Sequence, residues 1–230
     1  MTQDEAKRLV ARRAVEFVSD GMAVGLGTGS TASLFIRELA ERVKRDNLRI
    51  RCVASSDASA ALGTSLGLEV VSLAELPELD VYIDGADEVG PASQGLPLIK
   101  GGGGAHLREK ILASSAKRFI CVVDSTKIVP VLGKFPLPVE VIKMALPLVE
   151  RGLNELGINP KQRYHADGSV YLTDENNYIL DCACGQIPEP EELAAEVRSI
   201  VGVVEHGIFL GLASVVLVAG ENGVEELYPA

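Results

Sequence analysis

Short apolar runs alternate with helical stretches through the first half of this chain, and that alternation limits its possible folds more than any other feature. The run Met22–Gly27 is typical, because it is apolar, ends in glycines and is followed by a helical stretch at 30–43. Further strand-like runs and helices alternate in the same way, with strands expected at 48–54, 68–73, 80–84 and 118–124 and helices at 5–17, 58–66 and 106–115. Such alternation predicts an α/β fold, a Rossmann-like parallel sheet with helices on both faces.

The second half of the chain has a different pattern, which begins where prolines punctuate 133–138. The elements expected after them are a strand at 139–143, a helix at 146–156, strands around 170–173 and 178–181, and a helix at 190–200. This order predicts a smaller α+β (ferredoxin-like) domain with an antiparallel sheet. We place this small domain at 133–205, where we expect it to contribute to oligomerisation. The α/β catalytic domain then comprises 1–132 and 206–230, with the apolar end of the chain as a late strand.

Composition and charge exclude several classes of protein. The net charge of −10 argues against a nucleic-acid partner, since domains that grip phosphodiester backbones are basic. No apolar run is long enough to span a bilayer, so no membrane association is expected. The charged segment Met1–Arg13 has no signal-peptide core, and a cytoplasmic location is expected. Cys182 and Cys184 form a C-x-C pair, which departs from zinc-ligand spacing.

The first candidate site is the glycine-rich turn at 25–32, between a strand and a helix. Glycines let the backbone approach an anion, the N–H groups of a helix start point at it, and Thr28, Ser30 and Thr31 add hydroxyl donors. A dinucleotide fingerprint would need a third glycine where Ser30 stands, and an acidic residue where 54–56 reads Ala-Ser-Ser. We therefore favour a monophosphate ligand. A tight turn without a ligand is the other alternative.

An acidic turn, Asp84-Gly-Ala-Asp-Glu88, directly follows a buried strand. Ligands of doubly wound folds bind beyond the carboxyl ends of strands, where carboxylates can accept sugar hydroxyls or exchange protons with them. Asp84 and Asp87 also suggest magnesium, but no third oxygen ligand is spaced to make that specific. A solvated acidic turn remains the simpler alternative.

Two further loops carry lysines. In Lys100-Gly-Gly-Gly-Gly-Ala-His-Leu-Arg-Glu-Lys110, four successive glycines are costly to order, which suggests close approach to a ligand or an anion-binding nest. Glu109 falls in the helix that follows. Lys127 stands just past another strand, where it can meet a phosphate or a developing enolate. Each residue alone is ordinary, but four strand ends together supply phosphate donors, carboxylates, a base and two lysines.

Six strings of this sequence closely resemble the type A ribose-5-phosphate isomerase family, in order and with similar spacing over essentially the whole chain. They are Gly-Thr-Gly-Ser-Thr-Ala (27–32), Ser-Ser-Asp (55–57), Asp-Gly-Ala-Asp-Glu (84–88), Lys-Gly-Gly-Gly-Gly-Ala (100–105), Arg-Glu-Lys (108–110) and Gly-Lys-Phe-Pro-Leu-Pro-Val-Glu (133–140). The acidic string and the last string are the most specific. One departure is Gly104, where the family pattern often has alanine.

The resemblance implies a cofactor-free and metal-free aldose–ketose isomerase that acts as a homodimer or a dimer of dimers on a small sugar phosphate. It implies Glu109 as the proton acceptor. The substrate contacts that it implies are Thr28, Gly29, Ser30, Thr31, Asp84, Gly85, Ala86, Asp87, Lys100, Gly101, Gly102, Gly103 and Lys127.

The expected reaction interconverts ribose 5-phosphate and ribulose 5-phosphate through an enediolate, in the non-oxidative pentose phosphate pathway. Glu109 is the expected base, Asp84 or Asp87 assists ring opening, and Lys100 and Lys127 join glycine N–H groups in stabilising the enediolate. Whether lysines lower the pKa of Glu109 or burial raises it is open at this point. The alternatives are a non-catalytic sugar-phosphate sensor, a related sugar-phosphate deaminase or lactonase, and a dinucleotide-dependent oxidoreductase.

Overall fold

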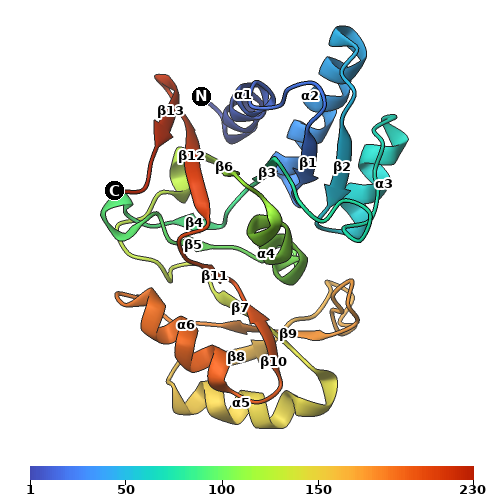
Figure 1. Ribbon diagram of the computed structural model, residues 1–230. Coiled ribbons are helices and arrows are strands. Elements are labelled where there is room, and N and C mark those ends of the chain that lie inside the picture. The colour runs from blue at the N-terminus through green and yellow to red at the C-terminus, as the bar shows by residue number, and fades with distance from the viewer.

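The structure is a computed structural model that describes all of residues 1–230. Its largest sheet has six strands in the order β13-β12-β6-β3-β1-β2, of which β13 alone is antiparallel to its neighbour (Figure 1). The strands are β1 (Ala23–Leu26), β2 (Arg51–Ala54), β3 (Val81–Asp84), β6 (Phe119–Asp124), β12 (Ala213–Gly220) and β13 (Gly223–Leu227). The predicted α/β sheet is confirmed, and the apolar end of the chain does enter it, as β12 beside β6.

Helices cover both faces of this sheet, as predicted. Successive residues of a strand point to opposite faces, and the two hydrophobic cores follow that rule. Ile83 shares one core with Val10 and Phe35, whereas its neighbour Tyr82 shares the other core with Leu112. The helices are α1 (Gln3–Val15), α2 (Ser30–Asp46), α3 (Asp57–Ser65) and α4 (His106–Ser115). The carboxyl ends of the parallel strands therefore meet at one edge between two helical layers.

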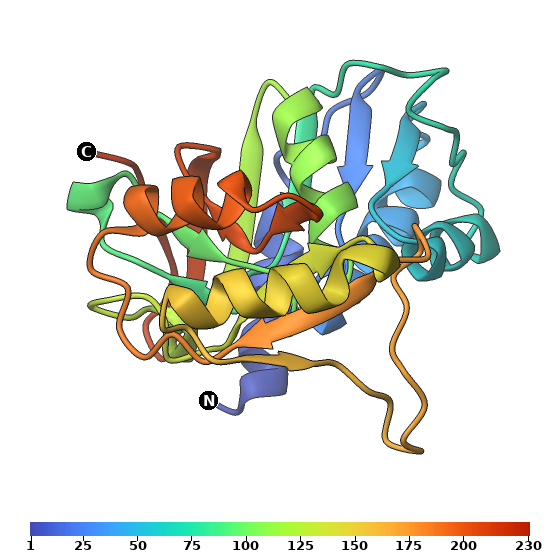
Figure 2. The ribbon, with the colours of Figure 1, turned by 90° about the horizontal axis from the view of Figure 1, so that it is seen from below.

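A second sheet, antiparallel and four-stranded, has the order β10-β7-β9-β8. Its elements are β7 (Leu137–Val141), η3 (Lys143–Ala145), α5 (Leu146–Glu155), β8 (Pro160–Gln162), β9 (Tyr178–Cys182), α6 (Pro190–Ser199) and β10 (Val203–His206). Figure 2 shows α5 and α6 on the same side of this sheet. Their residues Val149, Leu153 and Val197 share a core with Val139 and Leu180 of the strands. The smaller α+β unit thus has a hydrophobic core of its own.

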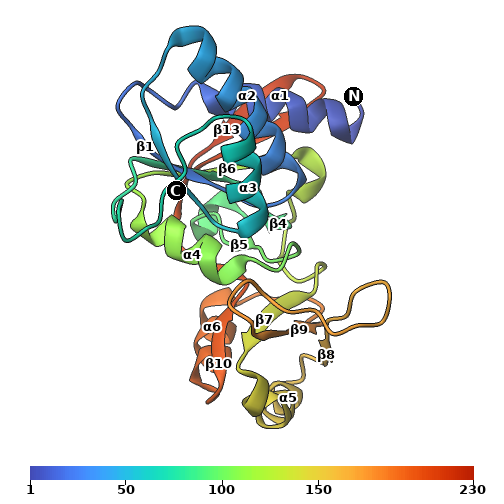
Figure 3. The same cartoon turned by 90° about the vertical axis from the view of Figure 1, so that its right-hand side faces the viewer.

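Three very short strands lie between the two sheets: β4 (Glu88–Val89), β5 (Leu98–Ile99) and β11 (Ile208–Phe209). A short 3-10 helix, η1 (Ala92–Gln94), connects β4 to β5, and a second, η2 (Ser125–Lys127), directly follows β6. In Figure 3, α4 lies between the large sheet and the smaller unit. This small sheet matters for the site because Lys100 directly follows β5.

Two expected strands form only single bridges. At 68–73 one bridge joins Val70 to Cys52, and at 170–173 one joins Val170 to Tyr164. The physical reason in the second case is that Pro160–Gln162 occupies the edge of β9 along which the predicted strand would have paired. No helix of the chain is both long enough and apolar enough to cross a membrane.

Candidate active site

The loops that follow β1, β3, β5 and β6 meet around a cavity of about 130 Å³. Its lining residues are Lys7, Thr28, Gly29, Ser30, Thr31, Gly85, Ala86, Asp87, Lys100, Gly101, Gly102, Gly103, Glu109 and Lys127. Every site residue named from the sequence is in this set except Asp84. The structure adds Lys7, which the sequence analysis missed.

Asp84 lies beneath the cavity and orders the loops around it. Its carboxylate is fully buried at the end of β3, and it accepts hydrogen bonds from the backbone N–H groups of Thr28 and Gly85 at 3.0 and 2.8 Å. The hydroxyl of Tyr82 donates a third hydrogen bond. A Cβ at Gly27 would overlap this carboxylate, so the close approach requires glycine there. Because both of its carboxylate oxygens already accept hydrogen bonds within the protein, Asp84 orders the neighbouring loops.

Lys100 joins Asp84 to the opposite wall of the cavity. Its ammonium lies 2.7 Å from Asp84 Oδ2 and 3.3 Å from Glu109 Oε2, and it donates to the carbonyl of Gly85. The side chain is almost fully buried. Burial alone would lower the pKa of Lys100, but the two carboxylates outweigh it and hold the pKa above its usual value. Lys100 therefore carries a fixed positive charge at the floor of the cavity.

Glu109 is a buried carboxylate, one oxygen of which lies beside an ammonium but accepts no hydrogen bond. It lies in the first turn of α4, it is 3% exposed, and its Oε2 accepts no hydrogen bond although Lys100 Nζ is 3.3 Å away. Burial raises the pKa of Glu109 to about 8, with a smaller upward contribution from Asp84 and an opposing one from Lys100. Of the two opposing effects left open by the sequence, burial is the stronger. A carboxylate tuned in this way suits proton transfer near neutral pH.

Asp87 forms the wall between the acidic turn and the glycines. It accepts a hydrogen bond from the backbone N–H of Gly102 at 2.8 Å. Burial raises its pKa, against the opposing effects of that N–H and of Lys100. Of the two aspartates that the sequence offered as sugar contacts, Asp87 alone lines the cavity.

The other end of the cavity combines a helix start with two lysines. Gly29 precedes α2 with φ of 101°, a conformation that favours glycine, and no side chain caps the helix. The first N–H groups of α2 are therefore available to an anion, with Lys7 and Lys127 beside them. The Thr28 hydroxyl is less available than expected, because it is hydrogen-bonded to Ser55 and Ser56.

Lys7 gave no local signal in the sequence. It lies on α1, between residues that look like an ordinary charged helix face. Its position follows from docking of the helix, since Gln3 Nε2 donates to Asp124 Oδ2 at the end of β6 at 3.2 Å. Only the tertiary structure brings Lys7 to the loops after β1 and β6.

Glu88, the last residue of the acidic string, has a structural task. Its buried carboxylate accepts hydrogen bonds at 2.7 Å from the backbone N–H groups of Gly133 and Phe135. The Phe135 ring in turn lies against Gly102, where an added Cβ would be 3.0 Å from it. Glu88 thus joins the two most specific strings of the sequence and supports the glycine turn from behind.

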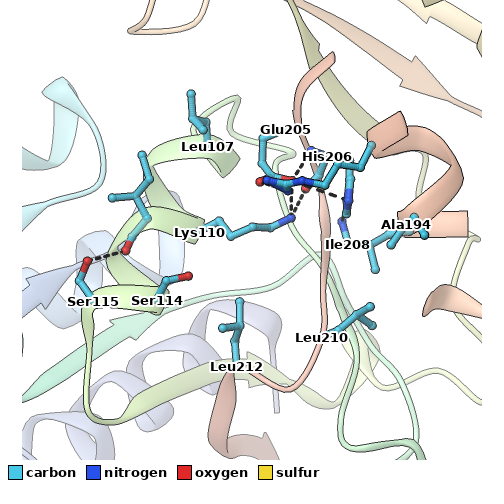
Figure 4. Close-up of a pocket in the computed structure, with 13 residues that line it drawn as sticks. Leu107, Lys110, Ser114, Ser115, Ala194, Glu205, His206, Ile208, Leu210 and Leu212 are labelled. Carbon is cyan, nitrogen blue, oxygen red and sulfur yellow. Dashed lines mark hydrogen bonds and ion pairs between the residues drawn. The ribbon is translucent and has the colours of Figure 1, made fainter. Parts of the chain in front are cut away.

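The residue after Glu109 points to a different side of α4. Figure 4 shows Lys110 reaching Glu205 and the His206 carbonyl, each at 2.7 Å. These groups line a separate, larger cavity of about 650 Å³ between α4, α6 and the segment after β10. That cavity is open and partly apolar, and it contains neither Glu109 nor Lys100. The carboxylate and lysine proposed from the sequence for the reaction therefore lie at the smaller cavity.

No group of three or more His, Cys, Asp or Glu side chains in the chain is placed to hold a metal ion. In the acidic turn, Asp84 is already engaged by Lys100 and backbone donors, and Asp87 by Gly102. Activity without a metal or cofactor stays a prediction, tested below.

Comparison with known proteins places the chain in a family. A model of ribose 5-phosphate isomerase A (phosphoriboisomerase A) matches residues 51–223. The ribose-5-phosphate isomerase A of Levilactobacillus brevis is 47% identical over 99% of this chain and 98% of its own length. The solved ribose 5-phosphate isomerase A of Methanocaldococcus jannaschii is 41% identical, with a TM-score of 0.94 over 99% of this chain and all of that one.

A second solved structure was determined with a ligand. It is a D-ribose-5-phosphate isomerase in complex with phospho-erythronic acid, 36% identical, with a TM-score of 0.95 over 99% of this chain and 100% of that one. With the family match and relatives of this identity along almost the whole length, this chain belongs to the ribose 5-phosphate isomerase A family.

Proposed function

We propose that this protein interconverts ribose 5-phosphate and ribulose 5-phosphate, with Glu109 as the base that moves the proton. One observation carries the proposal: the buried carboxylate of Glu109, with a pKa raised to about 8 and an oxygen that accepts no hydrogen bond, lines the cavity beside the Lys100 ammonium. Family membership supports the same reaction. A sensor would have no use for such a base, and a cavity of about 130 Å³ is too small for a dinucleotide.

The proton transfer follows from the position of Glu109. Its carboxylate takes the C2 proton of the open-chain aldose, and the C2–H electron pair forms the C1–C2 double bond while O1 gains the negative charge. A proton then passes from O2 to O1. The protonated Glu109 returns its proton to C1, the double bond moves to C2–O2, and the ketose is complete. Nothing is consumed, and the base is regenerated.

Lys100 and Asp87 serve the reacting end. The Lys100 ammonium, held by Asp84, lies next to Glu109 and stabilises negative charge on O1 and O2. Asp87, whose pKa is raised by burial, can exchange protons with sugar hydroxyls and so assist ring opening. We assign Asp84 as a positioning residue, because it is fully buried and does not line the cavity.

The phosphate binds at the other end, at the start of α2. The N–H groups after Gly29, the hydroxyls of Ser30 and Thr31, and the ammonium groups of Lys7 and Lys127 surround that part of the cavity. A four-carbon acid phosphate bound to a solved relative supports a site with one end for phosphate and one for developing anionic charge.

The test is direct. The purified protein is incubated with ribose 5-phosphate and EDTA in deuterated water, and ribulose 5-phosphate and deuterium incorporation are followed. We expect turnover without added metal or cofactor, and deuterium in the product. Loss of turnover on exhaustive chelation that magnesium restores would instead make Asp87 a metal ligand.

We also propose how the protein is organised in the cell. Residues 133–205 form a small domain that contributes to a homodimer or a dimer of dimers, and 1–132 with 206–230 form the catalytic domain. The small domain has a separate hydrophobic core that includes Val139, Val149 and Leu180, which supports treating it as a domain. A cytoplasmic location suits a small phosphorylated substrate. Light scattering tests the oligomeric state, and cell fractionation tests the location.

A further inference from the structure

The outer side of the glycine turn is held by the smaller α+β unit. Arg163 Nη1 donates to the carbonyls of Gly101 and Gly102 at 3.1 and 3.2 Å. The Tyr171 hydroxyl donates to the carbonyl of Gly103 at 3.1 Å. Both side chains come from the segment between β8 and β9, which in Figure 1 rises from the lower sheet toward α4. The carbonyls of three successive glycines thus point to side chains that lie outside the cavity.

Because peptide bonds are planar, the directions of these carbonyls also fix the directions of the N–H groups of the turn. In a trans peptide the C=O of one residue and the N–H of the next point in opposite directions, and the chain has no cis peptide. The Gly101 carbonyl points to Arg163, and the N–H of Gly102 accordingly points inward, to Asp87 Oδ2. By the same rule, the outward carbonyl of Gly102 turns the N–H of Gly103 inward.

The N–H of Gly103 has no acceptor in the protein. The Gly102 N–H is taken by Asp87 and the Gly104 N–H by the Gly101 carbonyl, so the Gly103 N–H between them is left unpaired. Gly103 lines the cavity together with Lys100 and Glu109. An unpaired backbone donor in such a place suits an oxyanion.

Arg163 and Tyr171 are themselves held firmly. The guanidinium is 13% exposed and forms a two-pronged pair with the carboxylate of Asp181. It also lies 5.5 Å from the centre of the Tyr171 ring, over its face. Gly104 has φ of 77°, and a Cβ there would overlap the Tyr171 hydroxyl. The glycine at this departure from the family pattern is what admits the tyrosine.

We propose that Arg163 and Tyr171 are positioning residues for the isomerisation: they fix the glycine turn so that the Gly103 N–H stabilises the enediolate. The inference rests on the proposed function and assigns the smaller unit a part in the chemistry. Neither residue lines the cavity. Their effect is transmitted through the two peptide planes on either side of Gly103.

The main test is Tyr171→Phe, which removes the donor to the Gly103 carbonyl and keeps the ring. We expect kcat to fall about three- to thirtyfold, less than the 10²–10³-fold cost of losing an oxyanion donor outright, while KM stays unchanged. The matched control is Tyr164→Phe. Tyr164 lies on the same segment, is exposed, and bonds only to Gln162.

Two ligands distinguish the loss of a positioned anion donor from a general distortion of the site. Phospho-erythronic acid has a carboxylate at the end of the chain away from its phosphate, whereas erythritol 4-phosphate has a neutral alcohol there on a chain of the same length. Calorimetric titration should show that Tyr171→Phe weakens binding of the acid by the same factor as kcat and leaves the alcohol unaffected. Equal weakening of both ligands, or behaviour like Tyr164→Phe, would overturn the inference.

Asp181→Asn provides a second variant without touching the turn. It removes the charge that orients Arg163, and it should produce the same selective loss for the acid. If the wild-type protein failed to isomerise ribose 5-phosphate, the proposed function would fail. The ratio of the two ligand affinities would still test whether Arg163 and Tyr171 position an anion donor.

Discussion

The two ends of the cavity are built in opposite ways. At the reacting end, Asp84, Lys100 and Glu109 are buried and already interact with one another. At the phosphate end, Gly29 and Ser30 are exposed, and Lys7 and Lys127 have no carboxylate within ion-pair distance. One end is organised before the substrate arrives, and the other offers donors that the substrate must complete.

This difference separates catalysis from binding. Buried charges that need no rearrangement stabilise charge that appears during the reaction, so they act on kcat. Donors for a phosphate whose charge hardly changes act equally on ground state and transition state, so they act on KM. Substitutions at the two ends should therefore affect different kinetic constants.

The largest effect is expected for Glu109→Gln, which keeps the shape of the side chain and removes its basic oxygen. We expect kcat to fall by about 10²–10⁴, the usual share of a general base, with KM for ribose 5-phosphate little changed. Exchange of the C2 proton with deuterated solvent should fall in parallel. Glu191→Gln, an exposed substitution on α6, serves as the control. Retention of more than about a tenth of kcat would place the base at Asp87 instead, since that is well outside the expected range.

A pH profile should show the same base in the free enzyme. Because burial raises the pKa of Glu109 to about 8, its deprotonated form becomes scarce at lower pH. We expect kcat/KM to rise about tenfold per pH unit from pH 6 toward 8 and then to level off. The residual activity of Glu109→Gln should lack this limb. A wild-type profile that is flat from pH 6 to 8 would mean that the base titrates well below neutrality.

Thr31→Ala examines the phosphate end. Hydrogen bonds to charged groups are worth about 1.5–3 kcal/mol, so KM should rise about 10- to 100-fold with kcat nearly unchanged. Thr64→Ala, on the exposed side of α3, is the matched control. A fall in kcat with constant KM would contradict the division between the two ends.

The smallest effect concerns stability. The pKa of Glu109 in the folded protein, about 8, is above its value of 4.5 in an unfolded chain, so the folded state binds the extra proton between these limits. Stability that is present below pH 4.5 is thus lost as pH rises through 8. Glu109→Gln mimics the protonated acid. Its Tm should exceed that of the wild type at pH 8, by about 2–4 °C per kcal/mol, and the two should converge toward pH 5. A lower Tm for the variant at pH 8 would show that the ion pair with Lys100 outweighs burial.

Much of the site could be predicted because its residues cluster in short strings after strands. Thr28, Asp87 and Lys100 each follow an apolar run, and parallel strands bring such ends to one edge. Burial was harder to foresee. Asp84 and Asp87 look equivalent in the sequence, yet one points beneath the cavity and the other into it.

The parts that escaped prediction depend on contacts between distant segments. Lys7, Arg163 and Tyr171 lie in segments with no local sign of function, and only packing brings them to the glycine turn or the phosphate end. The strands β4, β5 and β11 are two residues long, too short for hydrophobic periodicity to indicate pairing.

The position of β12 has a consequence for how this protein is made. It lies beside β6 in the large sheet, although the entire smaller unit separates them in the sequence. During synthesis β6 must wait, with one edge unpaired, until 213–220 leaves the ribosome. An open apolar edge is prone to wrong pairing. A nascent chain stopped before Ala213 should bind chaperones and fail to fold. A chain extended by about thirty residues past Leu227, enough to span the exit tunnel at about 3.3 Å per residue, should fold and leave the chaperones.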